Sequence, residues 1–190
     1  MKKKSLNMLC TLIMLCFCFA SCKKTNAPDT PKTELEKLPP ITQTGANTFG
    51  CLVNGVAWLP NGSKPQTGGS NIQIYVDPTF QGGVFSVGGN KYKIPDSHIS
   101  ISSGGCTNIG VYNLSSNLNA ASYYQTKLGS FACELSTTDI GCYKYGYFEI
   151  TKYDLATGIF SGTFVFKLYN PQSLCGDTIR ITNGRFDVKL

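Results

Sequence analysis

Short apolar segments separated by glycines fill the sequence from residue 45 to residue 190, and this pattern constrains the fold more than any other feature. All 20 glycines of the chain lie between Gly45 and Gly184, and eight of them form adjacent pairs. The segments between them are rich in Val, Ile, Thr, Tyr and Phe, and several alternate apolar with polar residues. No window carries the sustained apolar repeat of about 3.6 residues that marks an amphipathic helix. The pattern therefore predicts an all-β domain built from short strands.

Tight turns join most of the predicted strands, and such turns make neighbouring strands antiparallel. One flat open sheet with this many strands would leave long unpaired edges. We therefore expect a single antiparallel β-meander domain over residues 45–190 that forms a two-sheet sandwich. The alternative is a closed lipocalin-like β-barrel.

Three dipeptides of asparagine and glycine predict two-residue hairpin turns, because these residues tolerate the positive φ angles that such turns need. A two-residue turn also fixes which residues of the flanking strands face each other. The expected pairs are Cys51 with Trp58 across Asn54-Gly55, Val87 with Tyr92 across Gly89-Asn90, and Ile181 with Phe186 across Asn183-Gly184.

The longest alternating stretch is centred on a turn at residues 154–158. A five-residue loop there places Phe148 opposite Phe164 and Ile150 opposite Gly162, where the missing side chain leaves room for a neighbour. Burial of several phenylalanines in this stretch predicts the centre of the hydrophobic core.

The first 22 residues have the pattern of an export signal. A cationic start at residues 1–4 precedes an apolar run at residues 8–20, which is too short for the ~20-residue helix that spans a bilayer. Small residues then precede Cys22, and this arrangement resembles the lipobox of bacterial lipoproteins. The resemblance implies a signal peptide over residues 1–21 and a diacylglycerol on Cys22. An ordinary signal peptide or an uncleaved anchor is the alternative.

Residues 22–44 follow as a lipidated cysteine and a flexible tether, which contains four prolines and almost no apolar side chains. Lys23 and Lys24 follow Cys22, whereas an acidic residue there is a retention signal for the inner membrane in bacterial lipoproteins. The resemblance therefore implies the outer membrane, with the periplasmic face favoured over the cell surface.

Five cysteines lie in the predicted domain, and an exported protein can form disulfides. They are Cys51, Cys106, Cys133, Cys142 and Cys175. A four-residue turn would place Cys133 opposite Cys142, so we expect a disulfide between them. A bond between Cys51 and Cys175 and a set of five buried free thiols are the alternatives.

The sequence contains none of the common catalytic or metal-binding motifs. The single histidine, His98, lies in an alternating segment, and Asp139 and Asp154 lie at predicted turns, where carboxylates bind backbone N–H groups. We expect a protein that is not an enzyme and that has no metal or cofactor, although a carboxylate pair for glycoside hydrolysis stays open. Residues 45–190 contain 10 Lys and Arg against 8 Asp and Glu, which argues against a nucleic-acid partner.

Four tyrosines of one predicted strand share a face that is opposite to its buried residues. They are Tyr143, Tyr145, Tyr147 and Tyr153. An exposed aromatic face can stack on sugars or contact a protein partner. The alternative is that the tyrosines reflect only the β propensity of this residue or are covered in the fold.

Three segments together resemble a family of uncharacterised outer-membrane lipoproteins that is typical of Bacteroidetes. The segments are TFGCLVNGVAWL at residues 48–59, FEITKYDLATGIFSGTF at residues 148–164 and ITNGRFD at residues 181–187. The resemblance implies an exported, lipid-anchored β domain behind a proline-rich tether, and it implies no reaction.

These observations predict a lipid-anchored cell-envelope protein, attached to the membrane by its lipid, with a non-enzymatic binding or envelope-assembly role. Its partner would be a glycan or a protein. A lipocalin-like carrier of a small apolar ligand and a carbohydrate-binding or carbohydrate-active protein are the alternatives.

Overall fold

The computed structural model of the protein describes residues 32–63, 69–93, 95–126 and 132–190. The folded unit begins at Lys32 rather than at the predicted boundary of Gly45. Residues 32–44 belong to it because they pack and form hydrogen bonds on the sheet, with Leu38 buried. The predicted signal peptide and Cys22 lie outside the described residues.

Eleven strands and two short 3-10 helices form the described fold, and no described helix is long and apolar enough to cross a membrane. The strands are β1 (Thr48–Val53), β2 (Val56–Trp58), β3 (Ile72–Asp77), β4 (Val84–Lys91), β5 (Ser97–Ser103), β6 (Gly110–Asn113), β7 (Asn119–Thr126), β8 (Ala132–Ser136), β9 (Tyr143–Asp154), β10 (Ile159–Tyr169) and β11 (Ile179–Lys189). The 3-10 helices are η2 (Leu35–Lys37) and η3 (Phe80–Gly82). The prediction of an all-β fold is confirmed.

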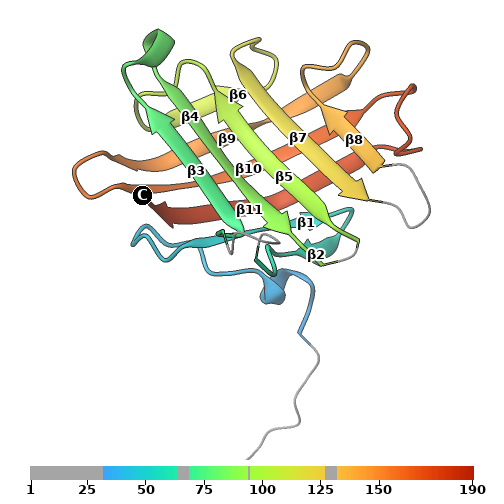
Figure 1. Ribbon diagram of the computed structural model, residues 1–190, viewed down its shortest axis with the longest axis horizontal. Helices are drawn as coiled ribbons and strands as arrows, with labels where there is room; N and C mark the ends of the chain where they lie inside the picture. Colours follow the sequence, from blue (N-terminus) through green and yellow to red (C-terminus); the bar gives the residue numbers. More distant parts are fainter. Residues whose placement is uncertain (1–31, 64–68, 94, 127–131) are drawn as a thin grey trace, which may run out of the picture. The chain divides into compact units, whose positions relative to one another are not determined.

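The strands form two antiparallel sheets, which Figure 1 shows one in front of the other with their strands crossing. One sheet has the order β2-β1-β11-β10-β9-β6 and the other has the order β3-β4-β5-β7-β8. Neither sheet closes on itself, so the sandwich is confirmed and the lipocalin-like barrel is wrong. Most neighbours follow one another in sequence, with three exceptions: β1 lies beside β11, β6 pairs with β9, and β5 pairs with β7.

The hairpin at Asn54-Gly55 is confirmed. Both residues have positive φ angles, and the turn pairs Cys51 with Trp58 as its length requires. The turn leaves β2 as a short edge strand beside β1.

The hairpin predicted at Asn183-Gly184 is wrong, because β11 continues through it as one strand. Asn183 has a φ of 52° and lies where the pairing with both neighbouring strands shifts register, which is the signature of a β-bulge. The glycine that follows lets a ring pack on the backbone, since a Cβ at Gly184 would lie 2.3 Å from the ring of Phe164.

The hairpin predicted at Gly89-Asn90 is also wrong. β4 runs through both residues, and Gly89 pairs with Ile99 of β5. A Cβ at Gly89 would lie 2.7 Å from Pro60 and 2.9 Å from Phe49. The glycine therefore serves close packing between the sheets rather than a turn.

The predicted pairing of Phe148 with Phe164 and of Ile150 with Gly162 is confirmed. The loop is one residue shorter than expected, because Asp154 already pairs with Ile159. A register shift in β9 between these two regions restores the pairing that the longer loop would have given.

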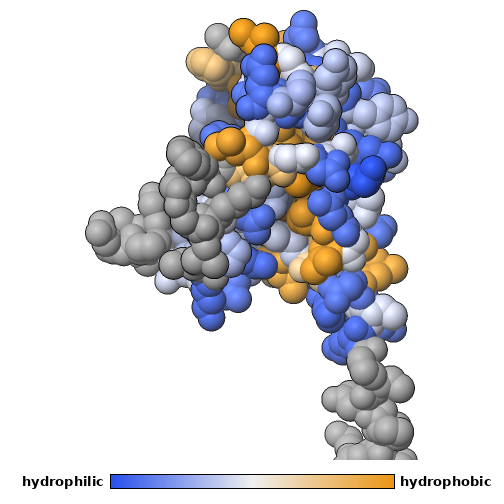
Figure 2. Space-filling model, turned by 90° about the vertical axis from the view of Figure 1, so that its right-hand side faces the viewer, coloured by the Kyte–Doolittle hydropathy of each residue, from blue (hydrophilic) through white to orange (hydrophobic). Residues whose placement is uncertain are grey.

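Phenylalanine rings from both sheets fill the space between them. Phe85 of the five-stranded sheet lies 5.8 Å from Phe186 and 6.2 Å from Phe160 of the six-stranded sheet, between ring centroids. All three side chains are at most 2% exposed. Hydrophobic side chains also reach the surface in separate places, as Figure 2 shows for one side of the molecule.

The predicted disulfide between Cys133 and Cys142 is wrong. Cys133 forms a disulfide with Cys175, in the connection between β10 and β11. The expected pairing fails because β8 pairs with β7 in one sheet, whereas β9 belongs to the other sheet. Cys142 is a free, half-buried thiol, and Cys51 and Cys106 are free and buried.

Candidate functional site

The outer face of the six-stranded sheet has two regions with different cover. An N-terminal strap, which we define as residues 33–46, crosses β1 and β11 and reaches β9. The other region has no such cover among the described residues and carries the tyrosine surface, which we define as Tyr143, Tyr145, Tyr147 and Tyr169. Both regions share one face, because Ser161 and Lys167 both lie on the outward side of β10, which is regular between them.

Asp187 of β11 holds the strap to the sheet. Its carboxylate is 1% exposed and accepts hydrogen bonds from the hydroxyls of Thr42 and Ser161, at 2.6 and 2.8 Å. It also accepts from the backbone N–H groups of Thr44 and Gly45, at 3.0 and 2.8 Å. Burial by itself would raise the pKa of Asp187, but these hydrogen bonds outweigh burial and lower the pKa well below its usual range. The carboxylate is therefore a structural anchor that stays ionised.

Contacts on both sides of Asp187 extend the strap across the sheet. Glu34 accepts a hydrogen bond from the backbone N–H of Ala57 in β2, and the carbonyl of Pro39 accepts one from the guanidinium of Arg185. At the other end, the amide of Gln43 donates to a backbone carbonyl of β9. The strap therefore occupies this region as part of the fold.

Three of the four predicted tyrosines are exposed where we expected them. The exposed fractions are 69% for Tyr143, 77% for Tyr145 and 41% for Tyr147. Tyr143 pairs with Tyr169 of β10, and their rings stack with centroids 6.1 Å apart. A shallow groove of about 280 Å³ runs between these rings and Thr178. Sequence reasoning missed Tyr169 as a member of the surface, although its alternation with Lys167 in β10 is a usable signal.

Tyr153 does not belong to this surface, so that part of the prediction is wrong. The register shift in β9 turns it to the inner face, where its ring packs edge-on against Phe160 at 5.0 Å. Its hydroxyl is buried and has no hydrogen-bond partner in the described structure. The alternation of the sequence could not show this reversal, because a bulge shifts the pattern by one residue.

Two cations lie beside the exposed rings. Lys167 lies directly opposite Tyr145 on one side and Arg180 of β11 on the other. Among the described residues, the only ion pair joins Lys37 with Glu34, so neither of these two cations has a carboxylate partner there.

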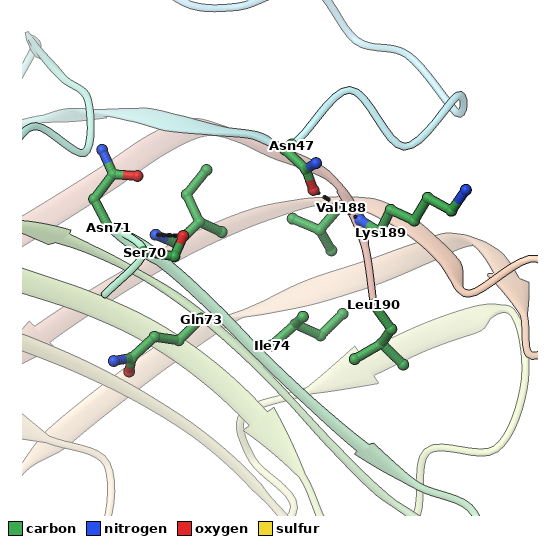
Figure 3. A pocket seen from close by; sticks show the side chains of 9 residues that line it. Asn47, Ser70, Asn71, Gln73, Ile74, Val188, Lys189 and Leu190 are labelled. Carbon is green, nitrogen blue, oxygen red and sulfur yellow. Dashed lines mark hydrogen bonds between the residues drawn. The ribbon is translucent and has the colours of Figure 1, made fainter. Parts of the chain in front are cut away.

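Two larger clefts lie elsewhere in the described structure. One of about 570 Å³ opens between β3 and the C-terminal end of β11, where Ile74, Val188 and Leu190 lie around it (Figure 3). The other, of about 430 Å³, lies on the outer face of the five-stranded sheet beside Tyr75 and His98.

The candidate acid and base groups have structural partners. The Nδ1 atom of His98 lies 2.9 Å from the amide oxygen of Asn90, and burial lowers the pKa of His98. Asp139 and Asp154 accept backbone hydrogen bonds in turns, as predicted, and Asp77 does the same. The described residues contain no group of three or more His, Cys, Asp or Glu side chains that could hold a metal ion.

The chain was also compared with known proteins. No family model, no curated protein and no solved structure matches it. A proposal for its function therefore depends on the geometry of its own surfaces.

Proposed function

We propose that this chain is a lipid-anchored envelope protein whose folded domain is a non-catalytic binding module. Its tyrosine surface binds polysaccharide. The single observation that carries this proposal is the group of exposed tyrosines on the part of the sheet face that the strap does not cover. Exposed aromatic rings contribute binding energy when a partner covers them, and they stack on the faces of sugar rings.

The anchor part of the proposal rests on the first 22 residues. The cationic start, the short apolar run and the small residues before Cys22 support lipidation at that thiol, with the domain held at the outer membrane on its periplasmic side. Substitution Cys22→Ser should abolish acyl labelling and release the protein from membranes. Membrane attachment that persists in this variant, with no acyl label on the wild type, would contradict lipidation.

The binding part is tested by affinity gel electrophoresis with soluble polysaccharides in the gel. The variant Tyr143→Ala/Tyr145→Ala should lose the retardation that the wild-type protein shows. Tyr75→Ala is the matched control, because Tyr75 is 55% exposed on the outer face of the other sheet. Equal retardation of the wild type and the double variant would contradict the proposal.

A second candidate function is the transport of a small apolar ligand in the cleft of Figure 3. The observation that favours it is the apolar lining of that cleft, to which Ile72, Ile74, Val188 and Leu190 contribute. Native mass spectrometry of the purified protein would detect a bound ligand of this kind as added mass. A spectrum with only the mass of the protein would count against transport.

A further inference from the structure

Two cations lie next to each other beside the tyrosine surface, and neither has an ion-pair partner among the described residues. Lys167 of β10 and Arg180 of β11 are direct cross-strand partners on the outer face. Side chains in such a pair have Cβ atoms about 4.5–5.5 Å apart, and like charges at this distance destabilise the sheet. Neither side chain forms an ion pair with any described carboxylate.

Two carboxylates lie near this pair along the chain, and neither forms an ion pair with it. Asp177 accepts a hydrogen bond from the backbone N–H of Thr178. Glu149 of β9 lies opposite Thr163, four residues before Lys167 in β10. A bound anion would relieve the repulsion between Lys167 and Arg180.

The same cross-strand row continues from the cations to an aromatic ring. Tyr145 is the partner of Lys167 on its other side, and Tyr143 and Tyr169 form the next row. An anionic group and a ring-shaped ligand would thus meet complementary groups within one short stretch of the sheet.

The lining of the groove indicates a saccharide rather than a peptide. Its one aliphatic member, Leu168, is fully buried, so the exposed lining consists of tyrosines, Lys167 and Thr178. Lysine is depleted at protein–protein interfaces, so the presence of Lys167 in this groove favours a saccharide.

We propose that the tyrosine surface binds an acidic polysaccharide, with sugar rings on Tyr143 and Tyr145 and a carboxylate or sulfate between Lys167 and Arg180. This proposal rests on the proposed function and specifies its ligand. The charge-assisted hydrogen bonds to the two cations add to the stacking and set the preference for charged over neutral chains.

The test compares two pairs of polymers, each with one backbone and two charge states. Polygalacturonate is compared with its methyl ester, and dextran sulfate with dextran, by affinity electrophoresis or calorimetry on the full-length protein. We expect at least one acidic polymer to bind about tenfold tighter than its neutral partner, with a preference that shrinks as salt is added. The two pairs distinguish a carboxylate from a sulfate as the preferred group.

The variant Lys167→Gln/Arg180→Gln should remove this preference, so that the acidic and the neutral polymer bind equally. Its urea midpoint should equal or exceed that of the wild type, because the substitution removes a repulsion. The matched control, Lys93→Gln/Lys189→Gln, removes the same charge at exposed sites elsewhere and should keep the preference. If the control variant loses as much binding of the acidic polymer as Lys167→Gln/Arg180→Gln does, the effect comes from net charge alone and the proposal is overturned.

Three further outcomes test this proposal and the function on which it rests. Equal binding of acidic and neutral polymers that still requires Tyr143 and Tyr145 would overturn the acidic ligand and leave the polysaccharide module standing. If poly-glutamate or anionic phospholipid vesicles bind as tightly as polygalacturonate, the proposal that the ligand is a saccharide is overturned. If the variant Tyr143→Ala/Tyr145→Ala binds every polymer as tightly as the wild type does, both proposals are overturned.

Discussion

The two regions of one sheet face show how the same backbone geometry serves stability in one place and exposure in another. Under the strap, the buried carboxylate of Asp187 accepts hydrogen bonds from hydroxyl and N–H groups of the strap, and Thr42 among these donors lies 145 positions away in the sequence. On the tyrosine surface, the rings have no cover among the described residues, and the neighbouring cations have no described carboxylate partner. The polar groups under the strap thus have protein partners, whereas those beside the tyrosine surface face solvent, and this second region is the one that we propose binds a ligand.

The largest effect is expected from the variant Asp187→Ala. It leaves the buried hydroxyl of Ser161 and several part-buried donors of the strap without an acceptor, so we expect a loss of about 3–5 kcal/mol in the free energy of unfolding. Urea denaturation measures it. Asp154→Ala is the control, since that carboxylate accepts similar backbone hydrogen bonds in an exposed turn. If both variants cost the same, Asp187 would not be the anchor of the strap.

Loss of the disulfide should have the next largest effect. The bond between Cys133 and Cys175 ties β8 to the connection that ends beside the tyrosine surface at Thr178. Its closed loop of 42 residues predicts a loss of about 2–4 kcal/mol in the variant Cys133→Ser/Cys175→Ser. Cys142→Ser should change stability little, and the reverse order of the two effects would contradict the assigned pairing.

Acid should weaken the strapped region in particular. The pKa of Asp187 is lower in the folded state than the value of about 3.9 that is usual in an unfolded chain. Its ionisation therefore stabilises the fold fully above that value, and the contribution is lost as the pH falls below it. The urea midpoint of the wild type should drop between pH 5 and pH 2 by more than that of Asp187→Asn. Parallel pH profiles would contradict this role.

The smallest effect on stability is expected on the tyrosine surface. Exposed side chains without packing partners usually change stability by about 0.5 kcal/mol or less, so Tyr145→Ala should unfold close to the wild-type urea midpoint. The same variant should weaken polysaccharide binding measurably. A large loss of stability together with unchanged binding would make Tyr145 a structural residue and reverse the contrast between the two regions.

Local patterns predicted those parts of the fold that depend on neighbouring residues. Alternation and the Asn54-Gly55 turn correctly indicated an all-β sandwich and one hairpin. Asn183-Gly184 has the same local chemistry, but β11 is held on both sides by β1 and β10, so the dipeptide forms a bulge instead. Positive φ angles suit a turn and a bulge equally, and only the neighbouring strands decide between them.

The candidate site shows the same limit. The exposure of Tyr143, Tyr145 and Tyr147 followed from their alternation with buried residues, whereas a bulge reversed Tyr153. Cys133 and Cys142 are close in sequence but belong to different sheets, so their pairing could not be read from spacing. The bonds between Asp187 and the strap join the two ends of the domain, and no local pattern encodes such a contact.

An NMR titration of the labelled protein with a polygalacturonate oligomer would show where on the domain the ligand binds. We expect shifts in amide signals to cluster at Tyr143, Tyr145, Lys167 and Arg180, while the signals of the strap and of Asp187 stay in place. Shifts that cluster on the strap or on the five-stranded sheet, or no shifts at saturating oligomer, would contradict the proposal.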